Sequence, residues 1–332
     1  MVLIITQEDD RSTDDIIDWL LYYNKPFVRI NGDDFNRSDL RYNYSVGNDI
    51  DKIASLEGVD FSQITSVFYR RWISFNFSYE KILKSFEDFS AFTLSNIKNN
   101  LVTEMRKSYS YLFDYLSLLD TKSLPNLKAL YVDKINVLNK AKDLGILIPN
   151  TIICNNKIDL VKFKLKYDKI ITKPLSEVLV FENISSDKKD QEIFFMRSSI
   201  VTNELIDNLE SKFFPSLFQQ YIEKDIEIRS FFLDGDLYSM AIFSQLHEQT
   251  KIDFRNYVED NPNRTIPFQL PNCLEDKLRK LMLQLDLNTG SFDIILTPDG
   301  DFYFLEINPV GQFGMTSIPC NYYIEKKIAK FL

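Results

Sequence analysis

The apolar and polar positions of the first thirty residues predict a strand, a helix and a second strand. Residues 2–6 form an apolar run that is typical of a buried strand, and residues 16–23 have the spacing of an amphipathic helix. The Ser-Thr-Asp-Asp segment at 12–15 is a typical helix start. Residues 26–30 form the second strand-like run. This order predicts a small parallel α/β domain, and the lack of Gly-x-Gly in the first turn argues against a dinucleotide-binding fold.

The rest of the pattern predicts longer helices and then a series of strands. Residues 64–72 form a further predicted strand, with Arg70 and Arg71 at its carboxyl end facing either the crevice of the domain or solvent. Helices are predicted at 79–119 and at 126–144, and a glycine ends the second one. The later elements are predicted as a helix at 202–213 and as strands at 169–175, 177–182, 192–201, 217–222, 227–233 and 237–245.

Residues 291–308 have the pattern of a β-hairpin whose polar side chains converge. Two apolar runs flank a Thr-Pro-Asp-Gly turn at 297–300. Asp293 lies on the first strand, while Glu306 and Asn308 lie two apart on the second, so we expect all three near one end of one face. An exposed hairpin with polar outer positions is the alternative. A charge inside such apolar strands is costly unless it is paired or bound to a metal, and three oxygen-bearing side chains suit Mg²⁺.

The composition narrows the classes of function. The chain has 332 residues, of which 45% are hydrophobic, with a formal net charge of −9 and a pI of about 4.9. No basic stripe and no apolar run of membrane-spanning length occur in the sequence, so we expect neither a nucleic-acid nor a membrane partner. The single His247 and three scattered cysteines argue against metal sites or triads built on those residues. The acidic N-terminus is unlike a signal peptide, and we expect a cytoplasmic protein.

The hairpin and the residues after it resemble the magnesium-binding end of the ATP-grasp ligases. The resemblance rests on Asp293 and on the run Glu-Ile-Asn-Pro-Val-Gly-Gln-Phe-Gly that begins at Glu306. The tail at 311–332 and the Asp-Phe-Arg run at 253–255 are similar to one branch of that family, the graspetide synthetases, which include the microviridin-type and grasp-with-spasm peptide maturases. The resemblance implies an ATP-grasp fold of mixed α/β (α+β) class. Its expected parts are an N-terminal parallel α/β domain at 1–124, a central α+β subdomain at 125–216 and a C-terminal antiparallel-sheet subdomain at 217–332.

The resemblance also implies which residues reach the phosphates of ATP. Lys134 and Lys173 match the two phosphate-binding lysines of the family. Lys173 closes an apolar strand, where a charged side chain needs an anionic partner. Relatives often have a glycine-rich flap after the second lysine, whereas this chain has Ser-Glu-Val-Leu at 176–179. In the family, an arginine just before the metal hairpin contacts the transferring phosphate, and Arg255 matches it.

Further matched residues belong to the adenine and ribose contacts. Gln220, Tyr221 and Ile222 match the adenine hinge, although the family often has glutamate at the position of Gln220. Glu227 matches the acid that holds the ribose hydroxyls. Because Glu227 and Arg229 alternate with isoleucines, they share one face, which we expect to look into the nucleotide cleft. An exposed cross-strand pair is the alternative.

The implied activity is ligation driven by ATP and Mg²⁺. A substrate carboxylate becomes an acyl phosphate, and a hydroxyl or amine then attacks the acyl carbon. Lys173, Arg229 and Arg255 are the residues expected to serve catalysis, with Mg²⁺ held by the hairpin carboxylates and Asn308, which also contacts the nucleotide. Phosphoryl transfer depends on positioning and charge neutralisation more than on protein nucleophiles.

The implied partner is a ribosomally made precursor peptide with a leader and a core. Its Asp or Glu side chains would be joined to Ser or Thr as ω-esters, or to Lys as ω-amides. A ligase for free amino acids or for glutamate addition is one alternative, and a non-catalytic nucleotide-dependent peptide-binding protein is another. We expect the leader to dock on residues 177–213, beside Lys188 and Lys189, although the aromatic residues there suit a subdomain core equally well. A homodimer is left open.

Overall fold

The chain forms two compact units, each of which combines segments distant in the sequence. The computed structural model describes residues 1–32, 41–48, 53–70, 89–119, 121–129, 132–175, 180–184, 191–195, 198–246, 250–252, 254–255 and 262–332. The first unit spans Met1–Tyr131, Asp286–Gly290 and Pro309–Leu332, and the second spans Val132–Leu285 and Ser291–Asn308. The three-part division at 1–124, 125–216 and 217–332 stays a prediction.

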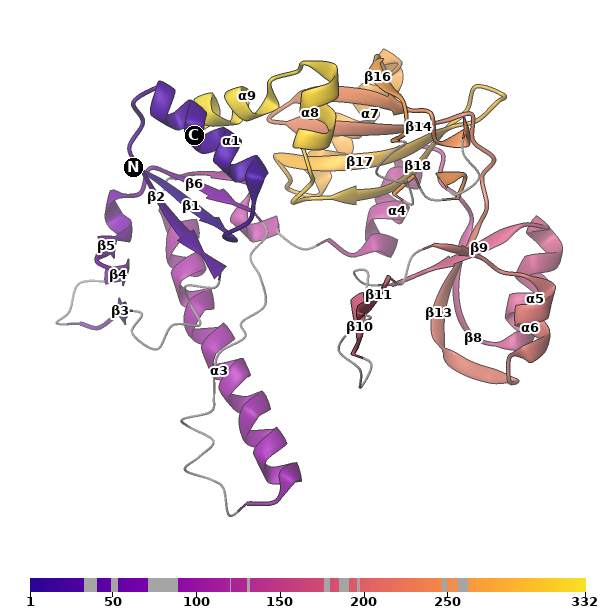
Figure 1. Cartoon of the computed structure of the whole chain (residues 1–332), viewed down its shortest axis with the longest axis horizontal. Coiled ribbons are helices and arrows are strands. Elements are labelled where there is room, and N and C mark those ends of the chain that lie inside the picture. Colours follow the sequence, from indigo (N-terminus) through magenta and orange to yellow (C-terminus); the bar gives the residue numbers. More distant parts are fainter. Residues whose placement is uncertain are drawn as a thin grey trace. The chain divides into compact units, whose positions relative to one another are not determined.

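A parallel sheet of four strands forms the centre of the first unit (Figure 1). Its strands and first helix are β1 (Val2–Thr6), α1 (Arg11–Tyr22), β2 (Phe27–Asn31), β6 (Ser66–Tyr69) and β7 (Lys122–Leu124). The strand order is β2-β1-β6-β7, and all neighbouring strands run parallel. Every residue of β1 is buried, as expected for an apolar strand between two neighbours. The predicted parallel α/β opening is therefore confirmed.

Arg70 follows β6 directly and lies buried at the carboxyl end of the sheet, with 2% of its surface exposed. Its backbone N–H donates to the carbonyl of Ile5, which continues the pairing of β6 with β1. Of the two positions considered for this arginine, the crevice is confirmed and the solvated strand end is wrong. Arg71 lies outside the described residues.

Within the described residues, the first unit also contains three further α-helices and a small sheet. They are α3 (Ala91–Leu118), α8 (Gly314–Cys320), α9 (Ile324–Phe331) and the antiparallel strands β3 (Tyr42–Ser45), β4 (Ile53–Leu56) and β5 (Val59–Asp60). The helix α3 buries only its C-terminal part, including Tyr109 and Leu116, in the core that contains Leu3 and Ile5. This confirms the predicted helix from Ala91 onward, while residues 79–88 lie outside the described part. The helix α9 lies along α1 (Figure 1).

Two antiparallel sheets make up most of the second unit, with strand orders β12-β9-β13-β8 and β16-β15-β14-β17-β18. The strands of the first sheet are β8 (Thr151–Asn156), β9 (Ile170–Lys173), β12 (Ser199–Ile200) and β13 (Lys212–Gln220). Those of the second are β14 (Ile226–Leu233), β15 (Asp236–Ile242), β16 (Thr265–Phe268), β17 (Thr289–Leu296) and β18 (Phe302–Asn308). The described residues of this unit also form the helices α4 (Lys134–Asp143), α5 (Lys157–Tyr167), α6 (Asn203–Asn208) and α7 (Asn272–Gln284) and the hairpin of β10 (Val180–Ile184) and β11 (Gln191–Phe195). The predicted mixed α/β class, with antiparallel sheets after a parallel one, is confirmed.

The helix predicted at 126–144 is shorter than expected, because a capping residue lies inside the predicted range. The helix α4 begins at Lys134, and the carboxylate of Asp133 accepts a hydrogen bond from the N–H of Asn136 at 2.7 Å. This contact satisfies one of the unpaired donors at the helix start. The predicted helix therefore began too early in the sequence, and Lys134 is the first residue of α4.

Two other predictions differ from the structure, one because of a proline and one because of strand pairing. The helix predicted at 202–213 ends at Asn208, and β13 begins at Lys212 and contains Pro215, which a helix interior does not accommodate. The strand predicted at 192–201 consists of β11 and β12, which belong to different sheets.

Among the described residues, no helix combines the length and the apolar character needed to cross a membrane.

Replacing Asp133 with alanine should destabilise the second unit. The loss of the cap is expected to cost about 1 kcal/mol, seen as a lower urea midpoint, whereas Asp133→Asn should keep most of the stability. Asp143→Ala serves as the control, because it removes the same charge at the exposed last residue of α4. Equal midpoints for Asp133→Ala and the wild type would show that the cap does not stabilise α4.

Candidate active site

The hairpin of β17 and β18 places two carboxylates opposite each other. Asp293 on β17 pairs with Glu306 on β18, and Ser291 pairs with Asn308. The register shifts directly after the first pair, which leaves Leu305 as an extra residue of β18. Such a β-bulge increases the local twist and changes the direction of neighbouring side chains. The hairpin thus brings the two carboxylates together on one face, as the sequence pattern predicts.

Arg229 holds the first of these carboxylates from the adjacent strand β14. Its Nη1 donates to Oδ1 of Asp293 at 3.1 Å, and the two side chains are 9% and 16% exposed. The Nε of Arg229 is buried and meets no hydrogen-bond acceptor among the described residues. Because a buried donor without an acceptor is unfavourable by about 1–3 kcal/mol, this N–H is available to a bound anion.

Lys173 lies at the end of β9 and points toward the second carboxylate. Its Nζ is 4.0 Å from Oε2 of Glu306, and its side chain is 11% exposed. Burial lowers the pKa of the Lys173 ammonium, and Lys134 and Arg255 lower it further, while Glu306 and Asp293 oppose the shift. The expectation that a charge closing this apolar strand needs an anionic partner is met by Glu306.

Burial raises the pKa of Asp293 from 3.8 to about 6. Arg229 acts against this shift, Glu306 adds to it by like-charge repulsion, Arg255 lowers the pKa and Glu227 raises it. The buried carboxyl therefore keeps its proton more readily than an ordinary aspartate. A cation placed between the two hairpin carboxylates removes this repulsion and favours the ionised form of both.

The donor set at the hairpin suits a cation that completes its shell from other sources. Within the described part of the chain, no group of three or more His, Cys, Asp or Glu side chains could hold a metal ion. Asp293 and Glu306 provide two carboxylates, and Asn308 is the next polar residue on the same strand. Mg²⁺ is typically bound by one or two carboxylates together with water and phosphate oxygens, so the residues present fit it.

Glu227 on β14 is buried and already has two partners. Its Oε1 accepts from Nζ of Lys224 at 2.7 Å and from Oγ of Ser244 at 2.6 Å. Lys224 also donates to the carbonyl of Ile252 at 3.0 Å. The structure buries both Glu227 and Arg229, so the alternative of an exposed pair is wrong. Lys224 and Ser244 were missed in the sequence because neither belongs to a periodic pattern.

The predicted adenine hinge lies where β13 ends. The N–H of Gln220 donates to the carbonyl of Asn150 at 2.8 Å, and the Gln220 side chain accepts from Nδ2 of Asn150 at 2.8 Å. The N–H of Tyr221 donates to the carbonyl of Lys169, whose Nζ lies 3.7 Å from the centre of the Tyr221 ring. Ile222 is buried. Two hydrogen bonds thus hold Gln220 to Asn150.

An open cavity brings most of the predicted residues together. The predicted residues in its lining are Lys173, Gln220, Tyr221, Ile222, Glu227, Arg255, Asp293 and Glu306. Lining residues that sequence reasoning missed include Pro149, Ile171, Ser198, Gln219, Lys224, Ile252, Phe254, Ile295 and Leu305. Apolar side chains thus surround a small set of charged groups.

Three predicted residues lie outside this lining. Arg229 acts on the cavity through Asp293. Lys134 is directed toward the carbonyl of Pro174, to which its Nζ donates at 3.1 Å, and it still lies close enough to lower the pKa of Lys173. Asn308 ends β18.

Some predicted features fall on residues that the structure does not describe. These are the flap at 176–179, Asp253 of the Asp-Phe-Arg run, and Lys188 and Lys189 of the expected leader-binding segment. Within that segment β10 and β11 form a hairpin, Phe213 packs against the core residue Phe218, and Phe214 is 84% exposed. Leader docking at 177–213 therefore stays a prediction, while Phe213 belongs to the subdomain core.

Comparison with known proteins shows the relationship through structure. No protein-family model and no curated protein matches the sequence. The macrocyclase MdnC from Microcystis aeruginosa MRC, bound with its precursor peptide MdnA, is 26% identical; the match covers 100% of this chain and 99% of MdnC, with a TM-score of 0.77. An ATP-grasp ligase from Chryseobacterium gregarium, associated with ribosomally synthesised and post-translationally modified peptides (RiPPs) and complexed with ADP and a leader and core peptide, is 24% identical. That match covers 99% of this chain and 94% of the ligase, with a TM-score of 0.80.

A more distant structure has the same fold. The ATP-grasp ligase PsnB was solved in complex with a phosphomimetic variant of its minimal precursor, Mg and ADP, and is 13% identical to this chain. The match covers 99% of this chain and 96% of PsnB, with a TM-score of 0.72. The predicted ATP-grasp fold and the predicted likeness to the graspetide branch are thus both confirmed. The chain has the ATP-grasp ligase fold and is built along its full length like the solved macrocyclases of ribosomally made peptides.

Proposed function

We propose that this ligase activates Asp or Glu side-chain carboxylates of a ribosomal precursor peptide and joins them to Ser or Thr hydroxyls, or to Lys amines, as ω-ester or ω-amide rings. The observation that carries the proposal is the half-buried pair of Asp293 and Glu306, which shares one cavity with Lys173. Full-length similarity to MdnC, which was solved with its precursor peptide, supports a peptide substrate. The cytoplasmic location and the absence of nucleic-acid partners stay predictions.

The residues of the cavity suit ATP and Mg²⁺. Asp293, Glu306 and Asn308 would hold the metal, and Glu227 the ribose hydroxyls. Lys134, Lys173 and Arg255 would neutralise the phosphates, while the hinge at 220–222 would receive the adenine. The buried Nε of Arg229 provides an unused donor beside the metal site.

In this proposal the protein side chains neutralise negative charge and hold the reacting groups in position. When bound, ATP and Mg²⁺ supply a phosphoryl group that makes a substrate carboxylate reactive toward a hydroxyl or an amine. Lys173 offsets the negative charge on the phosphate oxygens, and Arg229 keeps the carboxylate of Asp293 oriented through its 3.1 Å contact. Catalysis of this kind needs no nucleophilic side chain.

Neutralising either hairpin carboxylate should abolish ligation. Asp293→Asn and Glu306→Gln keep the size of the side chains but remove a charge from the metal site, so we expect a loss of at least about a hundredfold in dehydration of the precursor peptide, followed by mass spectrometry. Asp299→Asn, on the exposed turn of the same hairpin, should leave the rate unchanged. Near-wild-type, Mg²⁺-dependent ADP release by Asp293→Asn or Glu306→Gln would remove the metal assignment.

Removing the phosphate-neutralising cations should lower kcat more than nucleotide affinity. For Lys173→Met and for Arg255→Ala we expect a fall in kcat of about a hundredfold, equivalent to about 3 kcal/mol, because the contact strengthens as charge shifts in the transition state. Lys162→Met, an exposed lysine of α5, is the matched control. An unchanged kcat in the Arg255 variant, assayed with its precursor, would exclude that residue from the site.

The raised pKa of Asp293 predicts how stability depends on pH without metal. The unfolded carboxyl loses its proton near 3.8 and the folded one near 6, so the folded state binds more protons between these values. The contribution of Asp293 to stability is therefore largest below pH 4 and is lost as the pH rises through 6. We expect the difference in urea midpoint between the wild type and Asp293→Asn to shift against the wild type from pH 4.5 to 7. A pH-independent difference would contradict the assignment of this pKa.

A further inference from the structure

Lys224 is a buried lysine to which the proposed chemistry assigns no role. It lies in the segment that connects the hinge at 220–222 to β14, and only 2% of its side chain is exposed. The N–H of the next residue, Asp225, donates to the carbonyl of Leu296 at 2.9 Å, so β17 holds the backbone beside Lys224. A charged side chain this deeply buried is costly unless it meets acceptors, and the acceptors indicate what it does.

The first acceptor is Glu227, which is held at one oxygen by two donors. Nζ of Lys224 and Oγ of Ser244 both donate to Oε1 of Glu227, at 2.7 and 2.6 Å. Glu227 pairs with Ile242 of β15, and Ser244 follows two residues later in the chain. Ser244 is fully buried, and its carbonyl accepts from Oγ1 of Thr250 at 2.6 Å. Because two donors from different segments meet on the same oxygen, the carboxylate has little freedom to rotate.

The contact with Lys224 also bears on the charge of Glu227. Burial favours the protonated form of a carboxyl group, whereas a cation at hydrogen-bond distance favours the ionised form. An ionised carboxylate only accepts hydrogen bonds, and its contacts with hydroxyl donors are shorter and stronger than those of a neutral acid. Glu227 lines the cavity, so a ligand bound there reaches it. The ion pair thus favours the form of Glu227 that binds hydroxyl groups best.

A second contact of Lys224 suggests a different role. Its Nζ also donates to the carbonyl of Ile252 at 3.0 Å, and Gln245 donates to the carbonyl of Lys251 at 3.2 Å. These contacts hold the backbone of 251–252. A residue that only stabilised this segment would affect all nucleotides alike, whereas a residue that orients Glu227 affects the contacts of Glu227 in particular. The two roles therefore differ in their effect on ligand preference.

We propose that Lys224, together with Ser244, is a positioning residue that keeps Glu227 ionised and aimed at the ribose hydroxyls of the nucleotide. The proposal rests on the ribose contact proposed above for Glu227. Lys224 acts through Glu227 and touches no reacting group. A site built to bind a hydroxyl group discriminates against an analogue that lacks it, because the acceptor then loses its donor. The preference for ribose over deoxyribose should therefore depend on Lys224.

The test compares the binding of ADP with that of 2′-deoxy-ADP and 3′-deoxy-ADP, each of which lacks one ribose hydroxyl. Dissociation constants are measured by titration calorimetry on the full-length protein with Mg²⁺, so no peptide substrate is needed. We expect the wild type to bind ADP at least about tenfold more tightly than one of the analogues, as is typical of a hydrogen bond to a charged group. In Lys224→Met, which keeps a similar length but no charge, that preference should fall below about threefold.

Ser244→Ala tests the other donor at Oε1. It leaves the ion pair of Lys224 and Glu227 in place, so it is expected to fold even where Lys224→Met does not. We expect its preference for ADP to decrease by about two- to threefold, less than in Lys224→Met, because the charged contact remains. A preference that stays at the wild-type value in Lys224→Met or in Ser244→Ala would overturn the positioning role.

The double variant Lys224→Met/Glu227→Gln shows whether Lys224 acts through Glu227. It removes both charges together and so leaves no unpaired buried ion. Its preference for ADP over the deoxy analogues should equal that of Glu227→Gln alone, because the effects of two residues that act through one group do not add. A double variant whose preference differs from that of Glu227→Gln would show an action of Lys224 that bypasses Glu227, and would overturn the proposal.

The outcomes separate this proposal from the one on which it rests. A wild type that binds ADP and both deoxy analogues equally would overturn the ribose contact of Glu227 itself. A wild type that prefers ADP, with the same factor of weakening for all three nucleotides in Lys224→Met, would overturn only the role of Lys224 in orienting Glu227. That result would leave Lys224 as a support for residues 251–252.

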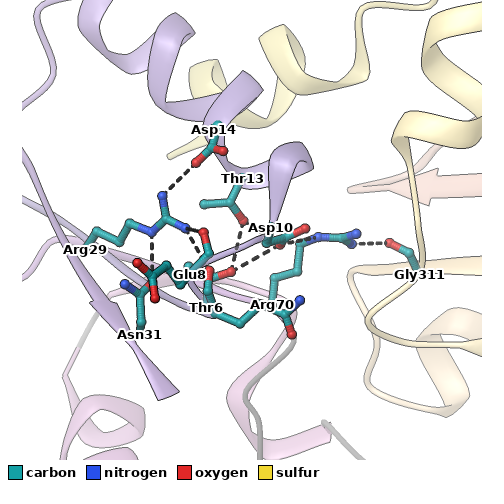
Figure 2. Close-up of polar contacts among 10 residues, drawn as sticks. Thr6, Glu8, Asp10, Thr13, Asp14, Arg29, Asn31, Arg70 and Gly311 are labelled. Carbon is teal, nitrogen blue, oxygen red and sulfur yellow. Dashed lines mark hydrogen bonds and ion pairs between the residues drawn. The ribbon is translucent and has the colours of Figure 1, made fainter. Parts of the chain in front are cut away.

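Arg29→Met is the matched control. Like Lys224, Arg29 joins a carboxylate to backbone carbonyls: it donates to Asp14 at 2.6 Å and to the carbonyls of Gln7 and Glu8 (Figure 2). These contacts lie within the first unit, whereas the residues that line the cavity belong to the second. Arg29→Met should therefore keep the wild-type preference for ADP. An equal loss of preference in Arg29→Met and Lys224→Met would show a general effect of removing a cation and would overturn the specific role of Lys224.

Discussion

The electrostatic constraint on the second unit is that two half-buried carboxylates, Asp293 and Glu306, lie opposite each other in one hairpin. Buried like charges repel and lose their hydration, and the pKa of about 6 for Asp293 records both effects. The protein offsets them from two other strands, with Arg229 beside Asp293 and Lys173 near Glu306. A divalent cation between the two carboxylates would reduce their mutual repulsion further.

Because the compensating charges come from separate strands, the site exists only in the folded unit. The strand β9 carries Lys173, β14 carries Arg229 and Glu227, and the hairpin carries the carboxylates. The cavity between them combines apolar side chains with charged and polar ones. Such a site can stabilise phosphoryl transfer by position and charge alone.

Much of this could be predicted from local sequence, and the limits have physical causes. The turn at 297–300 set the hairpin register, and hence the pairing of Asp293 with Glu306, because a turn leaves few alternatives. The bulge at Leu305 was not predictable, since an extra residue leaves the apolar pattern almost unchanged. Helix ends were misplaced where a single side chain, such as Asp133, decided the boundary. The contact of Arg70 with Gly311 joins residues far apart in the chain and has no local signal.

The most direct test of carboxylate activation follows one oxygen atom. A precursor peptide with ¹⁸O in its Asp and Glu side-chain carboxylates is incubated with the enzyme, ATP and Mg²⁺, and the inorganic phosphate is analysed by mass spectrometry. Activation of the carboxylate by phosphoryl transfer moves one of its oxygens to phosphate, so the account predicts one ¹⁸O in phosphate for each ring formed. Ring formation with unlabelled phosphate would contradict it.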